Sequence, residues 1–187
     1  MCLTIFSLSQ KPARNCTTHK VSMLTYLSRR TSEMQHTLAT TFQTTCLTHL
    51  YPHSTITLTL HILSDSGSLL ATLLNASTLA LIDAGIPMTS YIAAVTVATT
   101  AAFSDKEEDA DPLLDVNGIE EMELPFLTVA TSGEGDGVAV LVLETRVQVG
   151  RLEGMVSVGL DGCRQVRGIL DGVVRAHGKR VLEGKIG

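Results

Sequence analysis

The stretch LTLHILSDSGSLLATLLNASTLALIDAGIPM, residues Leu58–Met88, decides the fold because it joins two different hydrophobic periodicities. Apolar residues alternate with Thr and His over residues 55–62, which predicts a strand with one face toward a core. The turn SDSG follows and opens a helix that runs to Ala84, where a glycine and then a proline prevent its continuation. Because this helix is apolar on nearly every side, we expect it to be central and buried.

Upstream of this strand, apolar residues recur every four positions and predict an amphipathic helix. The face of this helix consists of Met34, Leu38, Phe42, Cys46 and Leu50. We expect Thr31 or Ser32 to cap its start. Tyr51-Pro52 is expected to end it, because the residue before a proline avoids helical dihedral angles.

Downstream, the pattern predicts short strands followed by a long C-terminal helix. The strands fall near residues 91–103, 113–116, 124–130 and 138–145, and the helix runs from about Arg151 to Leu182. The loop TSGEGDG joins the last two strands, so it differs from a dinucleotide-binding fingerprint, which leads into a helix. We expect the acidic run SDKEEDAD to be a solvated loop. This order of elements indicates an α+β fold with helices packed on a sheet.

Composition narrows the class of function. The 187 residues suffice for one domain with a sizeable core, and the formal charge of −5 argues against coating nucleic acid by bulk charge. No uninterrupted apolar run reaches about 18 residues, so no transmembrane helix is expected. The four cysteines include no CxxC pair, so we predict neither a metal site nor a cofactor.

Three blocks carry a family resemblance: RRTSEMQHTLATTF, the part of the opening stretch that begins at LHILSDSG, and LLDVNGIEEMELP. In this order they resemble the RNase PH family, and within it the eukaryotic RNA exosome ring subunits of the branch closest to the active archaeal phosphorolytic subunit. The resemblance covers about residue 29 to the C-terminus. It implies an RNase PH-like β-α-β-α domain, with helices packed on a mixed sheet.

The resemblance also implies an N-terminal truncation. Family members normally begin with a four- or five-stranded half before the equivalent of Arg29, and that half is not recognisable here. We therefore expect residues 1–28 to be a disordered segment outside the family and residues 29–187 to be a partial RNase PH-like domain. A truncated gene model explains this better than the alternative, a mitochondrial transit peptide. The central helix would then expose part of its apolar surface and favour association.

Active relatives release the terminal nucleotide of RNA with inorganic phosphate, and the resemblance indicates which residues here would take part. Gly67 and Ser68 match the turn that cradles phosphate at a helix N-terminus. Leu69 stands where active members have an arginine, so the bidentate phosphate clamp is lost. Asp115 matches the first acidic position of the family motif. Glu121 stands where an aspartate is usual, and its extra methylene moves the carboxylate by about an ångström.

Other charged residues near these positions have separate interpretations. Arg29 and Arg30 precede the first helix. Arg30 matches a phosphate- or RNA-contacting arginine of the family and Arg29 the neighbour of that arginine, so we expect both to contact the RNA backbone. Glu120 and Glu123 are expected to be solvated loop acids. The same interpretation stays open for Asp115.

The resemblance implies one of two functions. The first is a non-catalytic structural subunit of the RNA exosome ring that pairs with RNase PH-like paralogues and helps guide RNA for 3'-5' processing and decay. Ribosomal RNA maturation and messenger RNA turnover in the nucleus, nucleolus and cytoplasm would follow, with the exosome cap and hydrolytic subunits as further partners and no membrane involved. The alternative is an active phosphate-dependent 3'-5' exoribonuclease. The aliphatic Leu69 and the altered acid Glu121 favour the first.

Overall fold

The structure is a computed structural model that describes residues 4–12, 20–23, 29–52, 54–100, 111–133 and 137–184. Helices and strands follow one another along the whole described chain. In order they are β1 (Thr4–Pro12), β2 (Lys20–Met23), α1 (Arg29–Thr45), the 3-10 helix η1 (Thr48–Leu50), β3 (Ser54–Ile62), α2 (Leu69–Asp83), β4 (Ile92–Thr99), β5 (Pro112–Leu114), α3 (Gly118–Glu123), β6 (Phe126–Ser132), β7 (Val138–Leu143) and α4 (Val149–Leu182).

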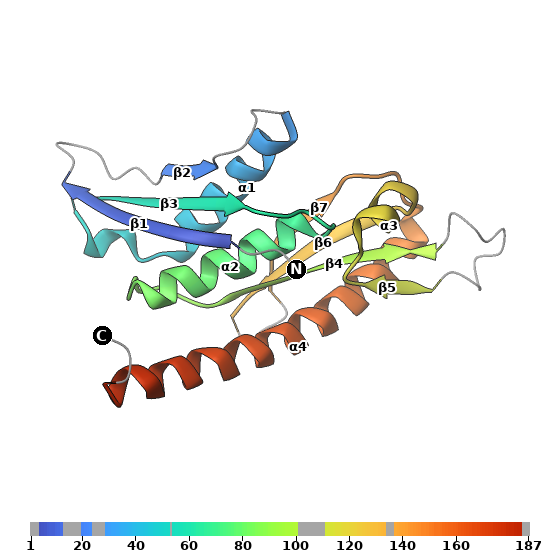
Figure 1. The fold of residues 1–187 in the computed structure, drawn as a ribbon. Coiled ribbons are helices and arrows are strands. Elements are labelled where there is room, and N and C mark those ends of the chain that lie inside the picture. Colours follow the sequence, from blue (N-terminus) through green and yellow to red (C-terminus); the bar gives the residue numbers. More distant parts are fainter. Residues whose placement is uncertain are drawn as a thin grey trace.

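These elements form four layers (Figure 1). A three-stranded sheet has the order β1-β3-β2, in which β1 is antiparallel and β2 parallel to β3. Helices α1 and α2 lie between this sheet and a four-stranded antiparallel sheet of order β5-β4-β6-β7. Helix α4 packs on the other face of the second sheet. The β-α-β-α arrangement with one mixed sheet confirms the predicted fold class.

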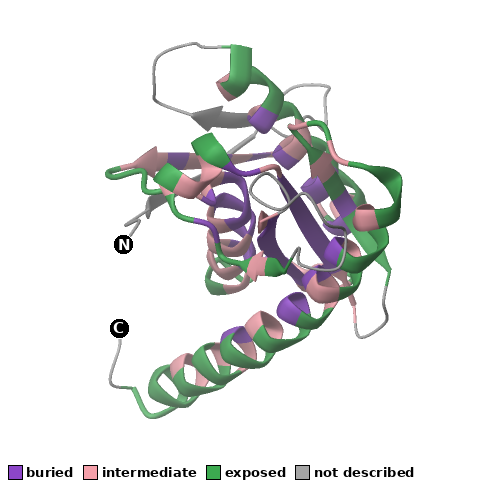
Figure 2. Ribbon diagram, turned by 90° about the vertical axis from the view of Figure 1, so that its right-hand side faces the viewer, coloured by how far each residue is buried: buried purple, intermediate pink, exposed green. Residues whose placement is uncertain are grey.

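The stretch Leu58–Met88 is central, as predicted. Strand β3 buries every second residue from Ile56 to Leu60, and α2 buries Leu73 and Leu74 completely. Figure 2 shows the buried residues gathered in α2 and the neighbouring strands, whereas the C-terminal part of α4 is mostly exposed. No apolar side chain of α2 is exposed, so the prediction of an exposed apolar surface on this helix is wrong. The helix is enclosed because a sheet lies on each side of it.

Two polar residues of α2 satisfy the backbone of β4. Strand β5 pairs only with residues 97–99, so the described part of the chain places no strand beside the rest of this edge. The side chain of Asn75 accepts from the N–H of Ala94 and donates to its carbonyl, both at 2.8 Å. Thr78 Oγ1 donates to the carbonyl of Ile92 at 3.0 Å. Buried backbone groups need such partners, which explains these polar residues within an apolar helix.

Helix α1 begins at Arg29, two residues before the predicted cap at Thr31. Nε of Arg29 lies 3.1 Å from Oε1 of Glu33, one turn later, and this pair supports the first turn. Arg29 and Arg30 therefore lie within the helix rather than before it.

The helix also ends earlier than the predicted stop at Tyr51-Pro52. Cys46 leaves the helix to form an isolated β-bridge with Met88, and the N–H of Leu47 donates to the carbonyl of Pro87 at 3.1 Å. Leu50 consequently lies in η1 and is exposed. The other four residues of the predicted stripe are buried.

The remaining elements follow the predictions with two exceptions. The segment after β5 contains a short helix, α3, which we had expected to be a loop. We expected no regular structure in residues 1–28, whereas β1 and β2 lie there and pair with β3. Residues 101–110, which include most of the acidic run, and residues 134–136 of the Gly-rich loop lie outside the described residues. Although α4 has 34 residues, neither it nor any other helix in the described ranges is both long and apolar enough to span a membrane.

Two cysteines are buried in separate parts of the core. Burial raises the pKa of Cys46 from 9.0 to about 11 and also raises the pKa of Cys163. Both thiols therefore remain protonated at neutral pH and behave as small apolar side chains.

Candidate functional site

The turn before α2 is fixed by its contact with the segment that leads into α3. Gly67 has a φ of +99°, and a Cβ at this position would lie 2.5 Å from the backbone carbon of Asn117. Only glycine fits such a conformation and such an approach. Ser68 is buried, and its backbone has a left-handed conformation with a φ of 52°. Its Oγ donates to the carbonyl of Val116 at 2.8 Å. The turn therefore packs closely against residues 116–118, and the Ser68 hydroxyl bonds to that segment.

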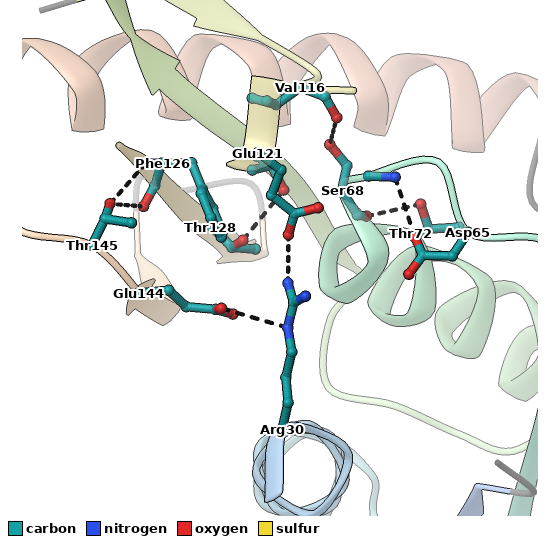
Figure 3. A network of polar contacts seen from close by, with 12 residues as sticks. Arg30, Asp65, Ser68, Thr72, Val116, Glu121, Phe126, Thr128, Glu144 and Thr145 are labelled. Atoms are coloured by element: carbon teal, nitrogen blue, oxygen red, sulfur yellow. Dashed lines mark hydrogen bonds and ion pairs between the residues drawn. The ribbon is translucent and has the colours of Figure 1, made fainter. Parts of the chain in front are cut away.

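Beside this turn lies a cavity of about 410 Å³, here called the Arg30 cavity. Arg30 enters it from α1, Glu121 from α3 and Glu144 from the end of β7 (Figure 3). Nη2 of Arg30 lies 2.5 Å from Oε1 of Glu121, and Nε lies 3.5 Å from Oε2 of Glu144. Asp65 also lines the cavity, and its Oδ1 accepts from the N–H of Gly67 at 3.2 Å.

Charge in the Arg30 cavity is dominated by carboxylates. Burial by itself lowers the pKa of Arg30, but the hydrogen bond to Glu121 and the charges of Glu144, Glu121 and Asp65 outweigh it, so the pKa is raised. The guanidinium is therefore always protonated. One arginine faces three carboxylates, which gives the charged lining residues a net charge of −2 at neutral pH. Such a cavity repels an anion.

A second cavity, of about 480 Å³, adjoins the same turn and is here called the α2–α4 groove. Ser68 lines it from the turn before α2, Asn75 from α2 and Gln165 from α4, and Asp115 is its only charged lining residue in the described ranges. Asp115 has a φ of +61°, and its N–H donates to the carbonyl of Thr96 at 2.9 Å. The rest of the lining is mostly apolar, so the described lining residues provide no cation for a phosphate.

The predicted site residues are divided between these two cavities. Arg30, Gly67 and Glu121 line the Arg30 cavity, whereas Ser68 and Asp115 line the α2–α4 groove. The two predicted acids therefore face different spaces. A common proton-transfer site would require them to approach the same reacting group.

Two further predicted residues line neither cavity. Leu69 is partly buried and packs against the main core, so its side chain has become part of the fold. Arg29 is on the surface, with 94% of its side chain exposed, and its partner Glu33 is 66% exposed. Arg29 is thus accessible to a phosphate group, whereas Leu69 is not positioned to meet one.

The acids of α3 have distinct positions. Glu120 was expected to be a solvated loop acid, but it closes a capping box: its Oε2 accepts from the N–H of Asn117 at 2.9 Å, and Asn117 Oδ1 accepts from the N–H of Glu120 at 3.0 Å. Glu123 is exposed at the end of the same helix. In the described ranges, no three His, Cys, Asp or Glu side chains come together in a way that could hold a metal ion.

Sequence reasoning missed two of the acids around Arg30. The local sequence could have indicated the position of Asp65, because an aspartate two residues before a glycine commonly accepts a hydrogen bond from the N–H of that glycine in a turn. No local sequence pattern indicated the role of Glu144, since its contact with Arg30 depends on where β7 lies relative to α1.

The β-α-β-α arrangement is an RNase PH-like fold. Residues 13–87 match the RNase PH family model, described as "3' exoribonuclease family, domain 1", so this part of the chain is an RNase PH domain. The match begins at residue 13, whereas the resemblance on which we based the domain boundary began near residue 29.

Among curated proteins, the chain is similar to exosome complex components. SKI6 of Saccharomyces cerevisiae is 32% identical over 152 residues, which cover 81% of this chain and 58% of that protein. The ski6 protein of Schizosaccharomyces pombe is 36% identical over 145 residues, covering 78% and 57% respectively. Human RRP41 is 33% identical over 150 residues, covering 80% and 58%. The chain thus spans less than two thirds of the length of these relatives.

Solved structures share the fold. Rice Rrp46 superposes with a TM-score of 0.80 at 19% identity, covering 93% of this chain and 84% of that chain. An archaeal exosome core chain has a TM-score of 0.69 at 16% identity, covering 91% of this chain and 77% of that chain. A chain of the Archaeoglobus fulgidus exosome with RNA bound to the active site has a TM-score of 0.66 at 15% identity, covering 89% and 78%.

Proposed function

We propose that this protein is a non-catalytic structural subunit of the RNA exosome ring. It pairs with RNase PH-like paralogues and helps guide RNA for 3'-5' processing and decay, including ribosomal RNA maturation and messenger RNA turnover. The similarity to SKI6 and RRP41, both described as exosome complex components, supports the place in the ring. The proposal includes the exosome cap and hydrolytic subunits as partners, and the nucleus, nucleolus and cytoplasm as locations.

The observation that carries the non-catalytic assignment is the charge of the two cavities. Phosphorolysis requires free cationic groups to hold the attacking phosphate and the developing negative charge. Arg30 is the only arginine or lysine among the described residues that line either cavity, and Glu121 and Glu144 already bind it. A missing charge-assisted hydrogen bond, as at Leu69, removes about 1.5–3 kcal/mol, or roughly ten- to more than a hundredfold in rate.

RNA guidance is assigned to Arg29 and Arg30 at the start of α1. The Arg29–Glu33 pair is exposed on both sides, so it is worth little and can exchange for an RNA phosphate. Arginine contacts to phosphates position an RNA strand without reading its sequence. This fits a subunit that directs RNA to separate hydrolytic subunits.

Phosphorolysis of 3'-labelled RNA by the chain co-expressed with RNase PH-like ring subunits tests the non-catalytic assignment. We expect no release of nucleoside diphosphate on addition of inorganic phosphate. Phosphate-dependent release that is abolished by Asp115→Asn would overturn the assignment. A hydrolysis control without phosphate separates contaminating nucleases from phosphorolysis.

One observation favours the alternative, an active phosphorolytic exoribonuclease. Asp115 is exposed and lines the same groove as Ser68, so a carboxylate and the turn before α2 share one space. In this reading Asp115 handles the proton of the leaving group. The same assay decides between the two functions, because only the enzyme loses activity in Asp115→Asn.

A further inference from the structure

Arg30 is held between two glutamates of unequal exposure. The side chain of Glu121 is 13% exposed and that of Glu144 is 32% exposed, while that of Arg30 is 48% exposed. Glu121 makes the closer contact with Arg30, at 2.5 Å, and Glu144 the longer one, at 3.5 Å. Glu121 is therefore the anchor, and Glu144 is the partner that solvent and ligands reach more easily.

Glu144 lies where two cavities meet. It lines the Arg30 cavity, and together with Arg30 and Glu33 it also lines a neighbouring cavity of about 310 Å³ between α1 and β7. Arg30 is accessible from both spaces, and Glu144 is present in both. A phosphate that approaches Arg30 from either cavity therefore meets the negative charge of Glu144, which opposes its approach.

We propose that Glu144 sets the affinity of this protein for RNA by competing with the RNA backbone for Arg30. An RNA phosphate binds Arg30 by replacing the Glu144 carboxylate, while Glu121 keeps the guanidinium in place. This inference rests on the proposed function, in which Arg30 is an RNA-backbone contact. It adds that the contact is restrained by a carboxylate of the same chain and that Glu144 acts through Arg30 as a positioning residue.

Binding of the full chain to a short fluorescent single-stranded oligoadenylate, measured by anisotropy over a range of salt concentrations, tests this proposal. Glu144→Gln is expected to tighten binding by about two- to fivefold, the range that corresponds to an exposed ion pair. The slope of log K against log salt should be about the same in both proteins, because Arg30 makes the same single phosphate contact in each. Glu153→Gln removes the same charge from an exposed position on α4 and is the matched control.

The variant Arg30→Gln, alone and combined with Glu144→Gln, distinguishes the RNA contact by Arg30 from the competition by Glu144. If Arg30→Gln weakens RNA binding but Glu144→Gln behaves like Glu153→Gln, Arg30 contacts RNA and the competition by Glu144 is refuted. If Arg30→Gln has no effect in either background, the RNA contact itself is refuted. The proposal requires that the gain from Glu144→Gln disappears when Arg30 is replaced. Circular dichroism confirms that each variant is folded before titration.

Discussion

The Arg30 cavity and the α2–α4 groove adjoin the same Gly67-Ser68 turn but satisfy their polar groups in different ways. In the groove, neutral side chains such as Asn75 and Ser68 bind backbone groups of neighbouring segments. In the Arg30 cavity, charged side chains bind one another. Among the described lining residues, neither arrangement leaves a free cation for phosphate. The comparison shows that polar groups on both sides of this turn stabilise the fold.

The largest expected effect concerns the turn between the cavities. Gly67→Ala should lower the free energy of unfolding by at least about 3 kcal/mol, because the positive φ and the approach of the Asn117 backbone both exclude a Cβ. Urea denaturation measures this change. Gly154→Ala is the control, because this glycine is helical and exposed and has no atom near its Cβ position. Alanine there should raise the free energy of unfolding by about 0.5–1 kcal/mol. A neutral Gly67→Ala would mean that the turn is not fixed by packing.

On the groove side, Asn75→Ala should lower the free energy of unfolding by about 2–3 kcal/mol. It removes two hydrogen bonds and leaves the N–H and carbonyl of Ala94 without their side-chain partners. Gln165→Ala changes an exposed residue that lines the same groove. Its free energy of unfolding should stay within about 0.5 kcal/mol of that of the native protein. Equal effects of the two variants would contradict a structural role for Asn75.

These residues also show what could be predicted from sequence. Local hydrophobic periodicity predicted strand β3 and helix α2, and both are as expected. Such patterns depend only on residues that are close in sequence. Helix α1 differed at its end because its limit there depends on a distant partner, Met88, and at its start because the local Arg29–Glu33 pair supports an earlier first turn. Helix α3 was missed because it is short and depends on a capping box. The site was only partly predictable, since the family resemblance indicated Arg30 and Glu121 but not the carboxylate of Glu144 beside them.

A smaller effect is expected when Leu69 is replaced by arginine, the residue that the family resemblance predicts at this position. Leu69→Arg should lower the free energy of unfolding by about 1–2 kcal/mol, because Leu69 packs against the core and an arginine must redirect its charged end to solvent. Thermal unfolding measures the loss, and calorimetry with orthophosphate measures any gain of binding. Unchanged stability combined with new phosphate binding would show that the turn still has the geometry of an anion site.

The smallest effects concern the ion pairs of the Arg30 cavity. Double-mutant cycles should give a coupling of about 1 kcal/mol for Arg30 with Glu121 and less than about 0.5 kcal/mol for Arg30 with Glu144. The closer contact and lower exposure of Glu121 explain the order. Equilibrium unfolding of the single and double glutamine variants provides these values. The reverse order would remove the distinction between an anchoring and an exchangeable carboxylate.

Calorimetric titration of the full chain with orthophosphate tests most directly whether either cavity holds a free anion site. Because Arg30, the only cation among the described residues that line the two cavities, is bound by two carboxylates, we predict no saturable binding with a Kd below about 1 mM. Saturable binding well below that value, abolished by Arg30→Gln, would contradict the account and support a phosphorolytic site.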